Sequence, residues 1–225
     1  MSETDKNDTA RQTAGEDDRY EAERSAKAAA SELPEEIREA VPNWEDEYLD
    51  RVSDRLMYNY DLERDRRIRG ERWTMYGEMR VLNQKQFFHP ALNYADHEAE
   101  EYLFVRRETE PSVSELQQLV ELGHEIADER IIADEEHFGT DVTFVLVCED
   151  VPDDVAEFVE GFRERELLKF GYYGHYDVNL VVVDPDAETA VASEAADVAE
   201  AFLLWEDVTK PNEGFFSRFA KRFWK

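Results

Sequence analysis

The run of residues 142–148 reads Val-Thr-Phe-Val-Leu-Val-Cys, and residues 178–183 read Val-Asn-Leu-Val-Val-Val. Both runs are apolar at nearly every position, which favours strands that are buried on both faces of a sheet. Between them, Pro152 opens a segment whose apolar residues recur at helical spacing. Two buried strands joined through a helix predict parallel pairing at the centre of an α/β fold.

Upstream, between residues 64 and 88, the hydrophobic period changes to 2, with a plausible turn at Arg69-Gly70. The alternating apolar residues are Trp73, Met75, Met79 and Val81. This pattern predicts two or three antiparallel strands, and residues 103–105 predict another short strand. We therefore predict a single-domain α/β fold, with a mixed sheet in which an antiparallel hairpin is followed by β-α-β-α-β crossovers with flanking helices.

Helix signals complete this prediction. Asn43 is a candidate N-cap for a helix that presents apolar residues on one face up to residue 60. Ser112 and Glu115 match a capping box. Residues 184–192 predict a turn and a short strand, and residues 193–205 predict a closing helix.

Composition divides the chain into three parts. Residues 1–32 are acidic, lack a sustained apolar face and predict a disordered tail. Residues 33–208 carry the strand and helix patterns and predict the folded domain. Residues 209–225 predict a linker followed by an amphipathic helix.

The chain carries 55 acidic residues against 26 Lys and Arg, a net charge of -29 spread over its length, and Arg outnumbers Lys 19 to 7. This composition resembles that of proteins from halophilic archaea, and residues 71–78 and 101–107 resemble uncharacterised conserved domains of such organisms. The resemblance implies no particular activity. High salt screens repulsion between carboxylates, so the acidity predicts adaptation to a salt-rich cytoplasm.

Cys148 is the single cysteine, which excludes an intrachain disulfide and fits a reducing compartment. No signal-peptide pattern or apolar stretch long enough to span a bilayer is present. We therefore expect a cytoplasmic protein, with a possible peripheral position at the inner face of the membrane.

Five arginines lie within nine residues: Arg64, Arg66, Arg67, Arg69 and Arg72. They predict either an anion-binding site or an ion-pair network with the interleaved acids, and both alternatives stay open. Nucleic acid is not an expected partner, and the sequence does not indicate an oligomeric state.

The predicted order helix, strand, strand, strand, helix, strand resembles the restriction-endonuclease-like fold. That fold implies a divalent metal held by an acidic residue and an E-x-K pair. The nearest match here is Asp65 with Glu78-Met79-Arg80, in which arginine replaces the lysine. The resemblance therefore implies the topology without the catalytic residues.

Other chemical motifs are weak. His89, Asp96, His97 and Glu98 follow no metal-ligand spacing, so we expect neither metal nor cofactor. Residues 170–176, with two glycines and three tyrosines, predict either a ligand-binding loop or a cover for one end of the sheet.

The C-terminal segment has the clearest surface chemistry. Residues 214–225 carry four cations and no acid. On a helical wheel the apolar half includes Phe215, Phe216, Phe219, Phe223 and Trp224, and the polar half includes Arg218, Lys221 and Arg222. Such a helix predicts binding to an anionic membrane surface or a partner protein, or docking onto its own domain.

These patterns predict a non-enzymatic cytoplasmic adaptor or accessory protein adapted to high salt, whose C-terminal helix binds a membrane surface or partner protein. The alternative is an enzyme or anion-ligand-binding protein that uses the arginine-rich hairpin 64–72 with the segment His89–Glu98. No catalytic residue is assigned in either case.

Overall fold

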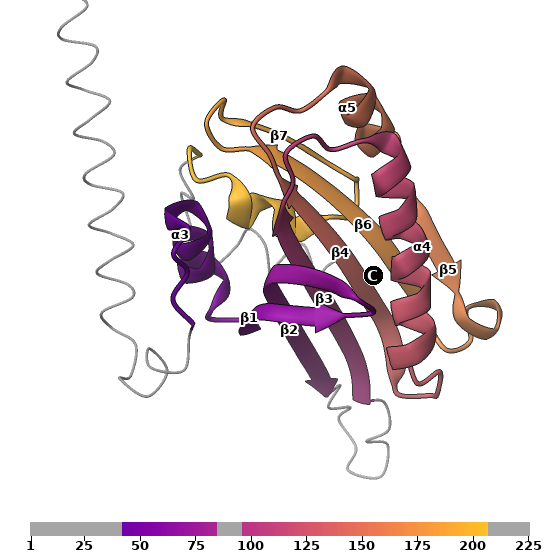
Figure 1. Ribbon diagram of the computed structural model, residues 1–225. Coiled ribbons are helices and arrows are strands. Elements are labelled where there is room, and N and C mark those ends of the chain that lie inside the picture. The colour runs from indigo at the N-terminus through magenta and orange to yellow at the C-terminus, as the bar shows by residue number, and fades with distance from the viewer. Residues whose placement is uncertain (1–41, 85–95, 207–225) are drawn as a thin grey trace, which may run out of the picture. The chain divides into compact units, whose positions relative to one another are not determined.

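The computed structural model describes residues 42–84 and 96–206, without the side chains of residues 82–84 and 96–97 (Figure 1). The described residues from Asn43 onward form one compact unit. Its elements are α3 (Glu47–Leu56), β1 (Asp61–Ile68), β2 (Glu71–Gln84), β3 (Asp96–Arg107), α4 (Val113–Arg130), β4 (His137–Val147), α5 (Asp153–Glu160), β5 (Glu164–Leu167), η2 (Leu168–Gly171), β6 (His175–Asp184), β7 (Thr189–Ala192) and η3 (Asp197–Phe202).

The described strands form one mixed sheet in the order β1-β2-β3-β4-β6-β5, and β7 also pairs with β6. β2 runs antiparallel to both β1 and β3, whereas β3, β4 and β6 are parallel. The short strands β5 and β7 run antiparallel to β6. The predicted mixed α/β fold, with an antiparallel hairpin followed by parallel crossovers, is confirmed.

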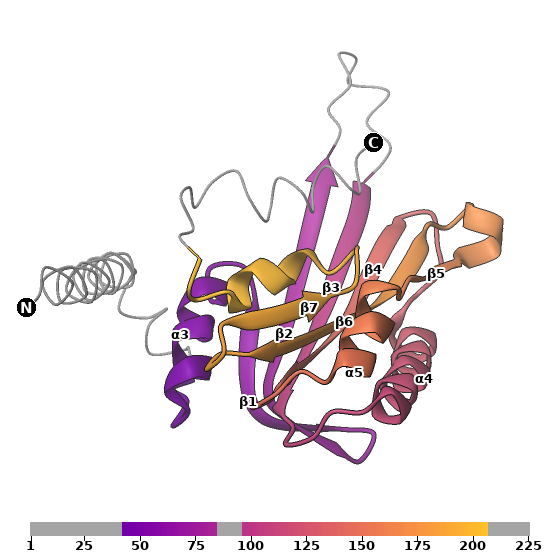
Figure 2. The same cartoon turned by 90° about the horizontal axis from the view of Figure 1, so that it is seen from above.

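One face of the sheet packs against α4 and α5, which lie together on that side in Figure 2. Its core holds an aromatic cluster in which the Phe104 and Phe144 rings stack with centroids 5.1 Å apart and Trp73 lies 5.3 Å from Phe104. Gly123 lets α4 approach the sheet closely, because a Cβ at this position would lie only 2.8 Å from Cγ1 of Val178 on β6. This face buries alternate residues of the two apolar runs, such as Phe144 and Leu180, and the residues between them are buried on the opposite face.

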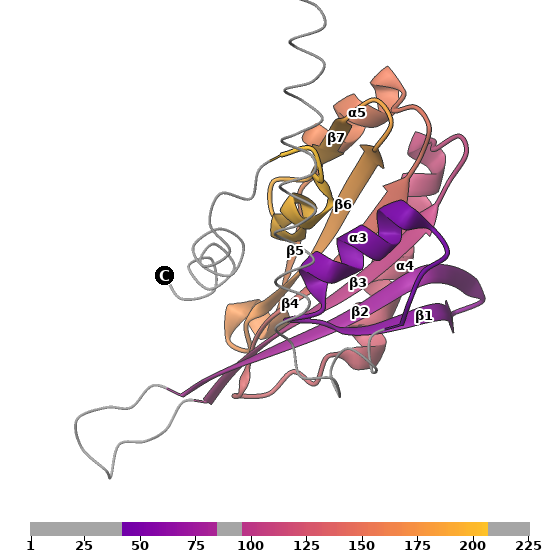
Figure 3. The same cartoon turned by 90° about the vertical axis from the view of Figure 1, so that its left-hand side faces the viewer.

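The opposite face is covered in part by α3 and η3, which lie in front of the strands in Figure 3, with α4 behind them. The Tyr48 hydroxyl donates a 2.7 Å hydrogen bond to the carbonyl of Phe202, and Arg55 donates to the carbonyl of Leu203 at 2.9 Å. These bonds join the first and last described elements. We call this face the α3 face.

Several sequence predictions of element boundaries are wrong. Asp46, not Asn43, caps α3, because its carboxylate accepts the backbone N–H groups of Tyr48 and Leu49. The closing helix predicted over 193–205 is a 3₁₀ helix confined to Asp197–Phe202. β3 is far longer than residues 103–105, and β5 was not predicted.

The predicted alternation along β2 is also wrong at one point. Trp73 and Tyr76 both belong to the core beneath α4, so the side-chain alternation shifts between them and Met75 faces the other way. Asp65, opposite this point on β1, has a left-handed φ of 56°. The register is the same on both sides of this point, because Arg64 pairs with Met75 and Arg66 pairs with Trp73, so no residue is inserted here.

Candidate functional site

The α3 face carries a row of carboxylates across the three central strands. Pairing places Glu101 of β3 beside Asp141 of β4, and Asp141 beside Asp177 of β6. Each of these residues is 2% exposed. On the next strand, Arg165 of β5 pairs with Asp177. We call Glu101, Asp141 and Asp177 the acidic row.

Glu101 is held by two hydroxyl groups. The Tyr60 hydroxyl donates to Oε2 at 2.7 Å, and the Thr143 hydroxyl donates to Oε1 at 3.0 Å. Burial, followed by the negative charges of Glu101 and Asp141, raises the pKa of Tyr60 well above its ordinary value. Tyr60 therefore stays protonated and remains a hydrogen-bond donor to this carboxylate.

Asp177 lies at the Arg165 end of the acidic row. Nε and Nη2 of Arg165 donate to its two carboxylate oxygens at 2.7 and 2.8 Å, a bidentate arrangement. The hydrogen bond to Asp177 is the largest cause that raises the pKa of Arg165. Nε2 of His175 lies 3.9 Å from Asp177 Oδ2. The row is thus compensated at this end by one permanent cation and one titratable group.

Asn179 lies two residues beyond Asp177 on β6 and therefore on the same face. It is 2% exposed, and its Nδ2 has no hydrogen-bond partner among the described residues. On its other side, Ser193 accepts the backbone N–H of Leu180 at 3.0 Å and lies near Asn179 Oδ1. A buried donor without an acceptor is energetically costly, and Trp73 Nε1 and Arg106 Nε are in the same situation among the described residues.

Sequence analysis missed the acidic row. Asp141 and Asp177 come directly before the apolar runs 142–148 and 178–183, and were left outside the predicted strands. A carboxylate directly before each apolar run was the available signal, because equivalent positions of neighbouring parallel strands lie side by side. The alignment with Glu101 could not be found without the register of β3.

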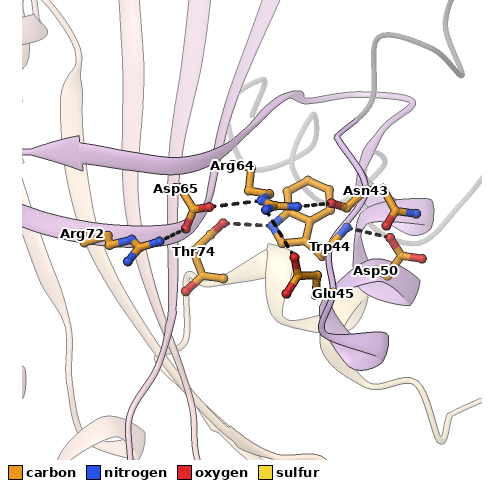
Figure 4. Close-up of polar contacts among 8 residues, drawn as sticks. All are labelled: Asn43, Trp44, Glu45, Asp50, Arg64, Asp65, Arg72 and Thr74. Carbon is orange, nitrogen blue, oxygen red and sulfur yellow. Dashed lines mark hydrogen bonds and ion pairs between the residues drawn. The ribbon is translucent and has the colours of Figure 1, made fainter.

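Four of the five arginines in the hairpin form ion pairs with carboxylates. Arg64 and Arg72 flank Asp65 at 3.1 and 2.7 Å, as Figure 4 shows. Arg66 pairs with Glu63, and Arg69 reaches Glu125 and Glu129 of α4 at 3.4 and 3.3 Å. Arg67 is exposed. These contacts support the ion-pair interpretation of the cluster.

The hairpin is also tied to α3. Figure 4 shows Arg64 donating to the carbonyl of Asn43 at 2.8 Å and Trp44 Nε1 donating to the carbonyl of Thr74 at 2.9 Å. The backbone N–H of Trp44 donates to Asp50 at 3.0 Å. At least one of the arginines therefore positions the start of α3 against the sheet.

Asp65 and Glu78, the two acidic residues of the endonuclease-like match, do not form a common site. Asp65 lies between Arg64 and Arg72, whereas Glu78 of β2 pairs in register with Asp61 and lies 3.7 Å from Arg130. Within residues 42–84 and 96–206, no group of three His, Cys, Asp or Glu side chains could hold a metal ion. The described residues give no support to a metal-dependent nuclease.

The segment His89–Glu98 lies largely outside the described residues. Of its side chains only Glu98 is described, and it forms an ion pair of 2.8 Å with Arg80. Cys148 is buried, and burial raises the pKa of its thiol to about 11. Its thiol is therefore a poor nucleophile near neutral pH, as expected for a small core residue.

The loop after β5 exposes large apolar side chains. Phe170 is fully exposed, and Tyr172 and Leu167 are 75% and 60% exposed. Lys169 and Phe170 have positive φ values of 47° and 62°. Phe170 and Tyr172 therefore do not cover the end of the sheet, whereas Tyr176 is buried with its hydroxyl 2.9 Å from His124 Nδ1.

A surface hollow of about 220 Å³ lies between the hairpin and α4, lined by Arg69, Arg106, Glu71, Glu115, Gln118, Leu119, Glu121, Leu122 and Glu125. It is smaller than most ligand pockets, and carboxylates dominate its charge. Arg106, its most enclosed cation, stacks on Trp73 and pairs with Glu71 at 2.8 Å. The hollow thus belongs to the ion-pair network around the hairpin.

The residues of the predicted C-terminal binding segment, 214–225, lie outside the described part of the chain. The family model described as Domain of unknown function (DUF8052) matches residues 45–204, so the chain belongs to this family. No curated protein and no solved structure matches the chain.

Proposed function

We propose that this member of a family of unknown function is a non-enzymatic accessory or adaptor protein, adapted to high salt, that binds a membrane surface or a partner protein. The observation that carries the proposal is the fully exposed Phe170 on the loop after β5. The C-terminal segment 214–225 supplies a second set of aromatic residues. A membrane surface is the favoured target.

The loop is anchored although its tip is strained. A non-glycine residue in the left-handed region costs roughly 1–2 kcal/mol, and Lys169 and Phe170 both adopt it. The backbone N–H of Leu168 donates to Gly174 O at 3.0 Å, and that of Tyr173 donates to Leu168 O at 3.2 Å. Such strain is typically found at functional sites, which supports a binding role for the exposed ring.

The chemistry of the loop suits a lipid interface. Aromatic residues are favoured at the headgroup level, and Lys169 can remain in water beside Phe170. Full burial of one large apolar side chain contributes on the order of 1.5–3 kcal/mol. Leu167 and Tyr172 lie beside Phe170, and the five aromatic residues of the C-terminal segment would add further insertion.

Among the described residues, no helix is long and apolar enough to cross a membrane. We therefore propose a peripheral position at the inner face of the membrane for a cytoplasmic protein. The alternative, an enzyme or anion-ligand-binding protein centred on hairpin 64–72, has less support because carboxylates of the same chain engage four of its arginines.

Co-sedimentation with anionic vesicles in molar KCl tests the proposal. Phe170→Ser should weaken binding about 10-fold or more, from the burial free energy of one ring, whereas Phe170→Leu should retain most of it. Truncation after Asn212 should weaken binding further, as should Phe219→Glu with Phe223→Glu, whereas Lys221→Gln should have little effect because salt screens its charge. Failure of the intact protein to bind vesicles contradicts the membrane proposal.

A further inference from the structure

Four of the five large apolar side chains that the described residues expose lie at one end of the sheet. Three of them, Leu167, Phe170 and Tyr172, lie at the end of β5 and on the loop after it. The fourth, Ile132, is 77% exposed on the loop between α4 and β4. β4 and β6 are parallel and start side by side, so the two loops meet at this end. We call these four residues the apolar tip.

Backbone contacts join the two loops that carry the apolar tip. Nδ1 of His137, the first residue of β4, donates to the carbonyl of Tyr173 at 2.7 Å. Gly174 packs so closely against Phe138 that a Cβ at this glycine would lie 2.1 Å from the Phe138 carbonyl oxygen. The rings of Tyr172 and Tyr173 contact edge to face, with centroids 5.1 Å apart. The two loops are therefore one connected part of the fold, and their exposed side chains share one surface.

The apolar tip protrudes and does not form a groove. Its members line neither the hollow beside α4 nor a second hollow, of about 370 Å³, beside the start of α3. Phe170 is fully exposed, so none of the described residues covers its ring. A folded partner needs a complementary surface around such side chains, whereas the interfacial region of a bilayer accepts them without one. The geometry therefore favours a lipid surface over a protein partner.

The charge around the apolar tip is mainly negative. Glu135 and Glu136 are exposed shortly after Ile132, and Lys169 precedes Phe170 on the other loop. Anionic headgroups repel the two glutamates in dilute buffer. At molar salt the Debye length falls to about 3 Å, which leaves burial of the apolar side chains as the dominant contribution to binding.

We propose that the apolar tip is the end of the domain that contacts the membrane, with Ile132 inserting as well as Phe170. This inference rests on the proposed function, and it adds a second loop and an orientation. The starts of β4 and β6 are directed toward the bilayer. The other end of β4, where α5 follows, is directed away from it (Figure 1).

Co-sedimentation of the full chain in molar KCl tests the role of Ile132. The vesicles contain phosphatidylcholine and phosphatidylglycerol in equal parts. Ile132→Ser should weaken binding about 10-fold, because one apolar side chain no longer inserts, whereas Ile132→Leu should retain most of the binding. Ile132→Ser with Phe170→Ser should weaken binding about 100-fold, since independent side chains contribute additively to the free energy. Wild-type affinity in Ile132→Ser would overturn the inference.

The same vesicles in dilute buffer test the orientation through charge. Glu135→Gln with Glu136→Gln should increase binding, because two carboxylates beside the apolar tip no longer face the headgroups. Glu157→Gln with Glu160→Gln on α5 is the matched control, since it removes the same charge from exposed residues away from the tip. Equal effects of the two double variants would contradict the proposed orientation.

An environment-sensitive fluorophore reports the contact directly. The fluorophore is attached to Ile132→Cys or, as the control, to Glu157→Cys. Cys148 stays unlabelled because it is buried and burial raises the pKa of its thiol to about 11. With the same vesicles in molar KCl, emission from position 132 should shift to the blue, and emission from position 157 should not.

The outcomes separate this inference from the proposed function. Co-sedimentation without a blue shift at position 132 would overturn the inference alone and leave the membrane function standing. Failure of the intact chain to co-sediment would overturn both. A blue shift at position 132 that appears without vesicles as the protein concentration rises would overturn the inference in favour of a contact between copies of this chain.

Discussion

Replacing Tyr60 by Phe removes a hydroxyl that donates to the acidic row and leaves the ring in place. The hydroxyl donates to Glu101 at 2.7 Å in a site where Tyr60 is 4% exposed. A hydrogen bond to a charged group contributes roughly 1.5–3 kcal/mol to the free energy of unfolding. At roughly 2–4 °C per kcal/mol for a chain of this size, the unfolding midpoint should fall by roughly 3–12 °C.

Tyr48→Phe is the matched control, because the Tyr48 hydroxyl donates at the same distance of 2.7 Å to a neutral carbonyl, that of Phe202. A neutral hydrogen bond contributes only about 0.5–1.5 kcal/mol, so this variant should lose about half as much stability. Urea unfolding in molar KCl, followed by circular dichroism, measures both variants. The charged-row interpretation is refuted if Tyr60→Phe costs no more than Tyr48→Phe.

Three further outcomes are expected. Thermal unfolding of the intact chain should shift to higher temperature from dilute buffer to molar KCl. The Debye length falls from about 10 Å at 0.1 M to about 3 Å at 1 M, so repulsion within a net charge of -29 is screened. An unfolding midpoint that does not change with salt would exclude salt adaptation. Gly174→Ala should lower the free energy of unfolding by more than the roughly 1–2 kcal/mol of left-handed backbone strain, because the new Cβ would lie 2.1 Å from the carbonyl oxygen of Phe138. An unchanged free energy of unfolding in a urea titration would contradict this. Burial raises the pKa of Asp46, but hydrogen bonds from Arg107 and the backbone outweigh burial, so the net effect lowers the pKa. The ionised carboxylate therefore stabilises the fold at pH values above its unfolded pKa of about 3.9. This contribution is lost as the pH falls through the lower folded pKa. The stability difference between wild type and Asp46→Asn should therefore be present at pH 6 and vanish in acid; a difference that is constant with pH would show that the charge is not responsible.

The central strands and crossover helices could be predicted because local sequence determines them. The runs 142–148 and 178–183 have one favourable environment, a sheet buried on both faces, and Ser112 accepts the N–H of Glu115 as the capping pattern predicts. The Glu115 side chain, in contrast, pairs with Arg106 and does not complete the capping box. That difference arises from a tertiary contact that sequence spacing does not encode.

The parts that sequence analysis missed depend on pairing between distant strands. β5 reads Glu-Arg-Glu-Leu and has no strand pattern of its own, but it pairs with β6, where Arg165 donates to Asp177. The acidic row likewise exists only once β3, β4 and β6 are in register. The change of face between Trp73 and Met75 coincides with the left-handed φ of Asp65 on the paired strand, which simple alternation could not predict.

The fraction of intact protein bound to anionic vesicles, measured as a function of KCl concentration, tests the proposed function most directly. A chain with a net charge of -29 is repelled by an anionic surface in dilute buffer, whereas insertion of Phe170 and other apolar side chains survives screening. The bound fraction should therefore rise as KCl increases toward molar concentrations. A bound fraction that stays at zero, or that falls with added salt, would contradict surface binding by exposed aromatic residues.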